Sequence, residues 1–172
     1  RRDMGPRWVP AYVALGSNLH DPATQVGQAL SRLSCISGTR LMARSRLWRS
    51  RPLGPQDQPD FVNAAAGLLT QLSAADLLAE LKGVERLMGR THPPVRWGPR
   101  IIDLDLVAYD ALECAEPGLT LPHPGAHQRN FVLHPLAEFA PALFIPGRGR
   151  VAELARSVGS EGLQVLSREA GA

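Results

Sequence analysis

The chain has 172 residues, of which 44% are hydrophobic and 20% are charged, as in an ordinary soluble globular protein. A chain of this length buries roughly 70% of the surface that its unfolded form exposes, so it needs no disulfide or metal to fold. This composition, without any apolar run of about 18 residues, argues against a disordered chain, a fibrous repeat and a membrane-spanning helix.

The charge is weakly basic and is carried almost entirely by arginine. There are 19 basic and 16 acidic residues, a net charge of +3, and Lys82 is the single lysine, so 18 of the basic residues are arginine. The sequence therefore has no lysine for a Walker A phosphate loop. Any phosphate would be bound by guanidinium groups, which suit bidentate contacts to oxyanions.

The first half of the chain predicts two strand-helix units. Residues 9–15 are typical of a buried strand, and Asp21 followed by Pro22 begins a helix that stops before Gly38. Residues 41–50 alternate like a strand with one exposed face, and the prolines of residues 52–59 predict a loop. Residues 61–70 form the next strand, after which Ser73 and Asp76 make a capping box for a helix that ends at Gly89.

The second half begins with a loop of Pro, Gly and Arg over residues 89–100, followed by an apolar strand over residues 101–109. The resulting order βαββαβ predicts an α+β fold, a ferredoxin-like sandwich with its helices on one sheet face and with C-terminal additions. The additions include a short helix near residues 151–158. We expect one domain over residues 1–172, with residues 1–8 disordered or foreign to the natural protein.

Two cysteines, Cys35 and Cys114, have no metal-binding or redox spacing, which favours reduced thiols. The N-terminal residues show no apolar stretch of a secretory signal. The sequence therefore predicts a cytoplasmic protein.

The sharpest local motif is Asp103-Leu104-Asp105 within an apolar strand. Alternation places both carboxylates on one face, with Cα atoms roughly 6.5 to 7 Å apart, where a cation would relieve their repulsion. Oxygen ligands fit Mg²⁺, and two ions could serve phosphoryl transfer. The alternative is a pair of solvated acids on an exposed strand face.

A cationic loop precedes these acids and contains Arg90, His92, Arg96 and Arg100. Guanidinium groups opposite metal-bound acids could clamp a polyphosphate. Salt bridges between these arginines and the acids are the simpler alternative.

Flat and polar side chains could bind a heteroaromatic ring. Phe61 and Asn63 share one strand face, although a core Phe beside a turn-capping Asn is the favoured interpretation of these two residues alone. His123 and Arg129 could contact a phosphate or sugar or belong to a plain loop.

Two other functions fit parts of this pattern. A sheet with many arginines could bind RNA, but aromatic residues are only 5% of the chain and no aromatic RNA-binding strand is present. The acid pair could also serve a different Mg²⁺-dependent phosphotransferase or a nuclease.

Four ordered segments resemble the 6-hydroxymethyl-7,8-dihydropterin pyrophosphokinase family of folate biosynthesis. They are L-G-S-N at residues 15–18, P-L-G-P-Q-D-Q-P-D-F-V-N at residues 52–63, R-W-G-P-R-I-I-D-L-D at residues 96–105 and L-P-H-P at residues 121–124. The resemblance extends over residues 11–141. It implies transfer of pyrophosphate from ATP to the pterin hydroxymethyl oxygen, with release of AMP.

The resemblance also implies roles for individual residues. Two Mg²⁺ ions would bind Asp103 and Asp105, and Arg90 and Arg100 would act on the transferred group. The pterin would contact Ser50, Leu53, Phe61, Asn63, Trp97 and Phe131. ATP would contact Glu85, His92, Trp97, Leu106, Thr120, His123 and Arg129. The partners would be these two small molecules, with no nucleic acid and no membrane, and the enzyme would be a monomer. We expect the loops at residues 52–59 and 89–100 to close over ATP and exclude water.

Overall fold

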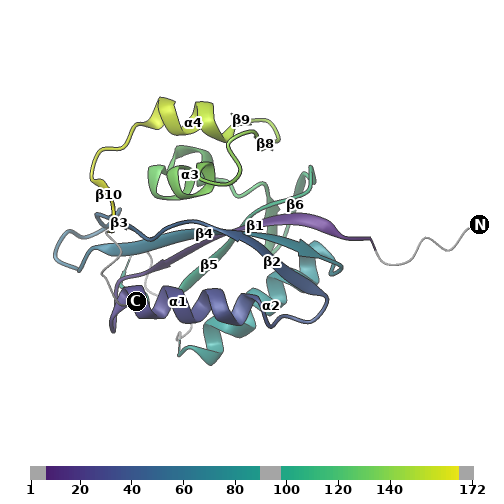
Figure 1. Cartoon of the computed structure of the whole chain (residues 1–172), viewed down its shortest axis with the longest axis horizontal. Coiled ribbons are helices and arrows are strands. Elements are labelled where there is room, and N and C mark those ends of the chain that lie inside the picture. Colours follow the sequence, from purple (N-terminus) through teal and green to yellow (C-terminus); the bar gives the residue numbers. More distant parts are fainter. Residues whose placement is uncertain (1–6, 90–97, 167–172) are drawn as a thin grey trace, which may run out of the picture.

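The structure is a computed structural model that describes residues 7–89 and 98–166 (Figure 1). Its elements are β1 (Val9–Ser17), α1 (Pro22–Leu33), β2 (Thr39–Arg44), β3 (Trp48–Ser50), β4 (Phe61–Thr70), α2 (Ala74–Leu87), β5 (Asp103–Tyr109), β6 (Cys114–Glu116), β7 (Leu119–Leu121), the 3-10 helix η1 (Ala126–Gln128), α3 (Asn130–Ala137), β8 (Phe144–Ile145), β9 (Gly149–Arg150), α4 (Val151–Val158) and β10 (Leu163–Val165). The fold is therefore mixed, with helices packed on an antiparallel sheet.

The main sheet has the strand order β10-β3-β4-β1-β5, and β2 also pairs with β4. All of these pairs are antiparallel. The long strand β4 lies beside β1 over nine residue pairs, from Val9 opposite Thr70 to Ser17 opposite Val62. This central pair contributes seven buried alanine and leucine side chains to the core, namely Ala11, Ala14, Leu15, Ala64, Ala65, Ala66 and Leu68.

Helices cover both faces of the sheet (Figure 1). Helices α1 and α2 bury Leu30, Leu33, Leu77 and Leu81 against one face. Helices α3 and α4 cover the other face with a second core that includes Leu133. The two helices of the predicted βαββαβ unit, α1 and α2, lie on one face as expected. The sequence did not predict that the C-terminal helices α3 and α4 cover the opposite face.

The predicted strand over residues 41–50 is interrupted in the structure. Residues 45–47 separate β2 from β3, and the Ser45 Oγ accepts a hydrogen bond from the Ala65 N–H at 2.9 Å. The Ser45 N–H donates to the Ala65 carbonyl at 2.9 Å. The Ser45 hydroxyl oxygen thus accepts a hydrogen bond that a main-chain carbonyl accepts in a regular sheet. The alternation of residue types does not predict this interruption of the strand.

The boundaries of α2 agree with the predicted capping signals, whereas Asp21 before α1 makes no side-chain capping hydrogen bond. Ser73 precedes α2, and its Oγ accepts a hydrogen bond from the Asp76 N–H at 3.1 Å. Gly89 follows α2 with a φ of 93°, a conformation that glycine adopts without strain. The predicted helix near residues 151–158 is confirmed as α4. At the N-terminal end, Trp8 packs under the Arg40 guanidinium at 4.6 Å, while residues 1–6 lie outside the described part of the chain.

A helix that crosses a bilayer needs about 20 predominantly apolar residues. Within residues 7–89 and 98–166, none of the helices is both long and apolar enough to cross a membrane.

Candidate active site

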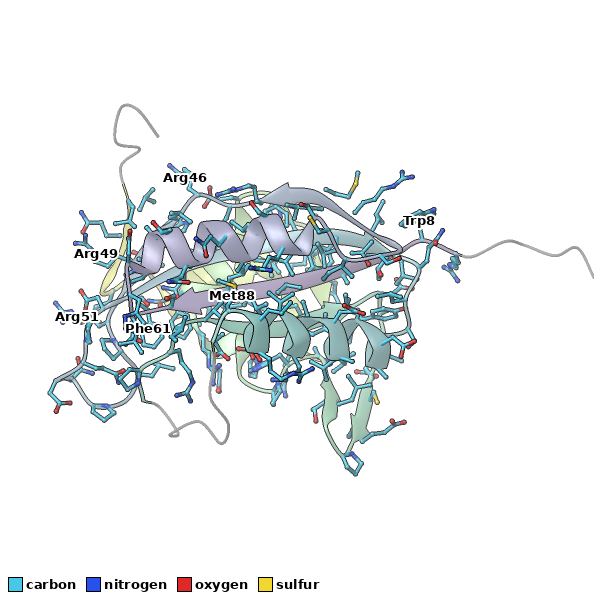
Figure 2. All side chains as sticks on the ribbon, turned by 90° about the horizontal axis from the view of Figure 1, so that it is seen from below. Trp8, Arg46, Arg49, Arg51, Phe61 and Met88 are labelled. Atoms are coloured by element: carbon cyan, nitrogen blue, oxygen red, sulfur yellow. The ribbon has the colours of Figure 1, made fainter. Side chains whose placement is uncertain are left out.

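A pocket with a volume of about 320 Å³ opens at one end of the sheet, on the face that α3 covers. Phe61 marks this end in Figure 2, near Arg49 and Arg51 and far from Trp8. The strands β1, β3, β4 and β5, the loop after β3, α3 and the segment before β5 all contribute side chains. The predicted site residues that line it are Ser50, Leu53, Phe61, Asn63, Arg100, Asp103, Asp105, His123, Arg129 and Phe131.

The floor of the pocket follows from the strand register. Gly16 of β1 lies opposite Asn63 of β4 and opposite Asp103 of β5, and Ala14 lies opposite Asp105. Opposed residues of antiparallel strands project from the same face, so these side chains point the same way. Because neighbouring strands are about 4.8 Å apart, roughly 10 Å separate β4 from β5. The small residues of β1 leave that interval open.

One half of the pocket presents a flat ring beside polar groups. Phe61 pairs with Ser50 of β3, and the Asn63 amide Nδ2 donates to Ser50 Oγ at 2.7 Å. Asn63 is 3% exposed and Ser50 is 4% exposed, so this hydrogen bond holds both side chains in place. Phe131, from the first turn of α3, lines the same pocket. The arrangement suits a planar, hydrogen-bonding heterocycle.

The other half of the pocket is acidic. The pKa of the Asp105 carboxyl is raised to about 7, first by burial and then by the negative charges of Asp103 and Glu85. Lys82 and Arg129 partly offset this effect. Within the described residues, no group of three acids, histidines or cysteines forms a complete metal cage. Two carboxylates with excess negative charge fit Mg²⁺, which keeps water and phosphate oxygens among its ligands.

Glu85 stands behind the acids and does not line the pocket. Its side chain is 0% exposed, and Oε2 accepts a hydrogen bond from the Leu104 N–H at 2.9 Å. Leu104 separates the two aspartates, so this contact fixes the free edge of β5 between them. Lys82, one turn earlier on α2, places Nζ 3.5 Å from Glu85 Oε1 and lines the pocket.

His123 faces the acids as a neutral imidazole. Burial lowers its pKa, and Arg129 lowers the pKa further against the opposing effect of Asp103. Its Nδ1 accepts a hydrogen bond from the Gly125 N–H at 3.1 Å, so the ring proton is on Nε2. Nε2 is 3.9 Å from Asp105 Oδ2, too far for a direct hydrogen bond.

Other predicted site residues lie elsewhere. Leu106 is buried in the core on the α1 and α2 side, and Thr120 is exposed on β7. Neither residue lines the pocket. Because side chains alternate along β5, Leu106 and Asp105 project from opposite faces of the strand. The predictions for Arg90, His92 and Trp97 concern positions outside the described residues.

Sequence reasoning gave no role to three residues that build the site. Gly16 forms its floor and Lys82 its charged wall. Asn18 is 1% exposed, and its Nδ2 donates to Gln58 Oε1 at 2.9 Å and to the Pro59 carbonyl at 3.0 Å. The available signals were the uniqueness of Lys82 and the L-G-S-N segment at residues 15–18, which contains Gly16 and Asn18.

Enzymes that transfer phosphoryl groups commonly place carboxylates and guanidinium groups around one pocket. A family model described as 7,8-dihydro-6-hydroxymethylpterin-pyrophosphokinase matches residues 12–141. The chain belongs to this family.

Two curated relatives extend over nearly the same length. The 2-amino-4-hydroxy-6-hydroxymethyldihydropteridine pyrophosphokinase of Haemophilus influenzae is 44% identical over 148 residues, which cover 86% of this chain and 92% of the relative. The protein of the same name from Pseudomonas aeruginosa is 44% identical over 155 residues, which cover 90% of this chain and 95% of the relative.

A solved structure shows a similar fold. The HPPK-DHPS protein of Plasmodium falciparum superposes with a TM-score of 0.73 and 12% identity. The similarity covers 94% of this chain and 49% of that protein, so this chain spans about half of its length. The similarity at this identity concerns the fold alone.

Proposed function

We propose that this chain transfers a pyrophosphoryl group from ATP to the hydroxymethyl oxygen of 6-hydroxymethyl-7,8-dihydropterin and releases AMP. The activity belongs to folate biosynthesis, as in its family. One observation carries the proposal for this site: Phe61 and Asn63 face the same pocket as Asp103 and Asp105, and only small residues of β1 lie between the two pairs.

The ring-binding half supports a pterin as acceptor. Phe61 and Phe131 offer aromatic faces, while Asn63 and Ser50 offer an amide and a hydroxyl to the edge of the heterocycle. The main chain near Leu53 and the side chain of Trp97 complete this subsite in the proposal. A ring held here directs its hydroxymethyl group across Gly16 toward the acids.

The acidic half supports a metal-assisted transfer. Asp103 and Asp105 would hold two Mg²⁺ ions, which would neutralise charge on the ATP phosphates when bound. The excess negative charge that raises the pKa of Asp105 to about 7 is what a cation would relieve. Arg100 supplies a guanidinium group that lines the pocket, and we assign Arg90 the same task.

The remaining assignments concern ATP. Arg129 and His123 line the pocket beside the acids, where a guanidinium and a neutral Nε2–H can donate to phosphate oxygens. Further ATP contacts are proposed for His92, Trp97 and Thr120, whereas the buried Glu85 and Leu106 support β5 instead. The acceptor oxygen attacks the β-phosphorus in line, the bond from that phosphorus to the AMP oxygen breaks, and positioning with charge neutralisation supplies the catalysis.

The decisive experiment identifies the nucleotide product formed from ATP, Mg²⁺ and the pterin. We expect AMP in an amount equal to the pyrophosphorylated pterin, and none without the pterin. ADP as the product would mean that the γ-phosphorus is attacked. Turnover that is independent of the pterin would overturn the assignment of the ring-binding half.

We also propose a single, monomeric, cytoplasmic pyrophosphokinase domain with a ferredoxin-like core. Support for the core comes from the order β5-β1-β4 followed by β2 and β3, with α1 and α2 on one face. The family match over residues 12–141 supports one domain. Its test is the mass in solution by light scattering, for which a dimer would be the contrary result.

A further inference from the structure

A segment after α4 returns from the helical layer to the edge of the sheet. Residues 159–166, here named the C-terminal strap, descend from α4 past α3 and end in β10 beside β3 (Figure 1). The strap lies outside residues 12–141, the range that the family model matches.

The last four residues of the strap run beside β3 and pair with it along the whole length of β3. Leu163 lies opposite Ser50 and Val165 lies opposite Trp48, and the Leu166 N–H donates to the Leu47 carbonyl at 2.9 Å. The short β3 is thereby enclosed between β4 and β10. A three-residue strand has few hydrogen bonds of its own, so its second neighbour matters for holding Ser50 in position.

The strap is also bound to α3. His134 Nε2 donates to the Gly159 carbonyl at 2.8 Å, and Asn130 Nδ2 donates to the Glu161 carbonyl at 3.0 Å. The two donors are four residues apart and share one face of α3. Asn130 immediately precedes Phe131, which lines the candidate active site.

A second cavity, of about 480 Å³, lies between the strap and the active-site pocket. Glu161 and Gly162 of the strap form one side of it. Five residues line both this cavity and the active-site pocket, namely Ser50, Arg51, Leu53, Arg129 and Phe131. The wall of the ring-binding half is therefore thin, and its outer side is held by the strap.

We propose that the C-terminal strap is a positioning element for the pterin. It joins β3 to α3 and so fixes the spacing between Ser50 and Phe131, without touching the reacting phosphates. This inference rests on the proposed function, because it concerns the same ring-binding half. Loss of the strap weakens binding of the pterin and leaves binding of ATP and the transfer step intact.

The test compares two shortened chains and one full-length variant. A chain that stops after residue 158 lacks the strap, whereas a chain that stops after residue 166 retains it and is the matched control. In the full-length double variant Asn130→Ala/His134→Phe, both hydrogen bonds from α3 are removed, which tests the strap without shortening the chain. Calorimetry gives the Kd of the pterin, and AMP formation gives the KM of each substrate and kcat.

We expect the chain without the strap and the double variant to bind the pterin about tenfold more weakly, as loss of two hydrogen bonds predicts. Their KM for ATP and kcat should stay within about twofold of the full chain. Amide exchange of residues 48–50 should be faster in the double variant. An unchanged pterin Kd in the double variant, or an equal loss of affinity for ATP, overturns the proposal. Failure of the full chain to form AMP would instead reject the proposed function.

Discussion

Asn18 and Arg100 exchange two hydrogen bonds although 82 positions separate them in the chain. The Asn18 N–H donates to the Arg100 carbonyl at 2.9 Å, and the Arg100 N–H donates to Asn18 Oδ1 at 2.7 Å. The same Asn18 side chain binds Gln58 and Pro59. One buried amide therefore joins the end of β1 to both loops that border the pocket.

Replacement of Asn18 by Ala should damage stability and activity together. It leaves the Arg100 N–H and the Pro59 carbonyl without their partner, which costs about 2 to 3 kcal/mol and lowers Tm by roughly 5 to 10 °C. We expect kcat/KM to fall at least about tenfold, because Arg100 loses its anchor. Thermal unfolding and AMP formation measure the two effects. Gln28→Ala, at an exposed position of α1, is the control, and equal behaviour of the two variants would contradict the role of Asn18.

The acidic half predicts an unusual pH dependence of stability in the absence of metal. The pKa of Asp105 rises from its ordinary value of 3.8 to about 7 in the folded chain. A carboxyl with a raised pKa stabilises the folded state fully below its unfolded pKa, and this stabilisation is lost as the pH rises through the folded pKa. The chain in EDTA should therefore lose stability between pH 4 and pH 7, on account of this group.

Asp105→Asn isolates that contribution because the amide stays neutral at every pH. We expect the Tm of this variant in EDTA to exceed that of the unchanged chain at pH 8, with the difference vanishing near pH 4. Turnover should be abolished while the fold is kept. Asp57→Asn, in an exposed loop, is the matched substitution. Parallel Tm curves for Asp105→Asn and the unchanged chain would refute the cause assigned to the raised pKa.

The open floor of the pocket predicts that added bulk at Gly16 blocks the pterin. A Cβ at this position would lie 3.3 Å from Asn63 Oδ1 and 3.7 Å from Phe61 Cδ1. Gly16→Val should raise the KM of the pterin at least about tenfold, since the added methyl groups enter the ring-binding half. Gly27→Ala, where a Cβ meets nothing within 4 Å, should leave kinetics unchanged. A normal pterin KM for Gly16→Val would show that the ring binds elsewhere.

Local sequence patterns predicted much of the fold and part of the candidate site. Alternation in β5 correctly placed Asp103 and Asp105 on one face. The capping box at Ser73 correctly marked the start of α2. These features depend on neighbours in the chain, so the residue types reveal them directly.

Contacts between distant segments did not follow from the sequence. The hydrogen bonds of Asn18 reach Gln58 and Arg100, and no local pattern specifies such partners. The side chain of Lys82 lies beside the acids only because α2 packs along the free edge of β5. The second helical layer was likewise missed, since α3 owes its position to the sheet face that its apolar residues cover.

The family resemblance and the structure give Glu85 different roles, one as a contact to ATP and one as a support for β5. The resemblance implies that it lines the ATP side, whereas in the structure its buried Oε2 accepts the hydrogen bond of the Leu104 N–H. Glu85→Leu leaves this N–H and the charge of Lys82 without that partner, which costs about 2 to 4 kcal/mol. Glu85→Gln retains an oxygen acceptor and should recover much of the lost stability, as thermal unfolding would show.

The charge of Glu85 has a separate consequence, which the same glutamine variant reveals. Glu85 raises the pKa of Asp105, so its neutralisation should lower that pKa and extend activity toward more acidic pH. We expect the acidic limb of kcat/KM to move down in Glu85→Gln with the KM for ATP unchanged, because the carboxyl supports β5 rather than the nucleotide. A raised KM for ATP with an unmoved pH profile would establish Glu85 as a nucleotide ligand instead.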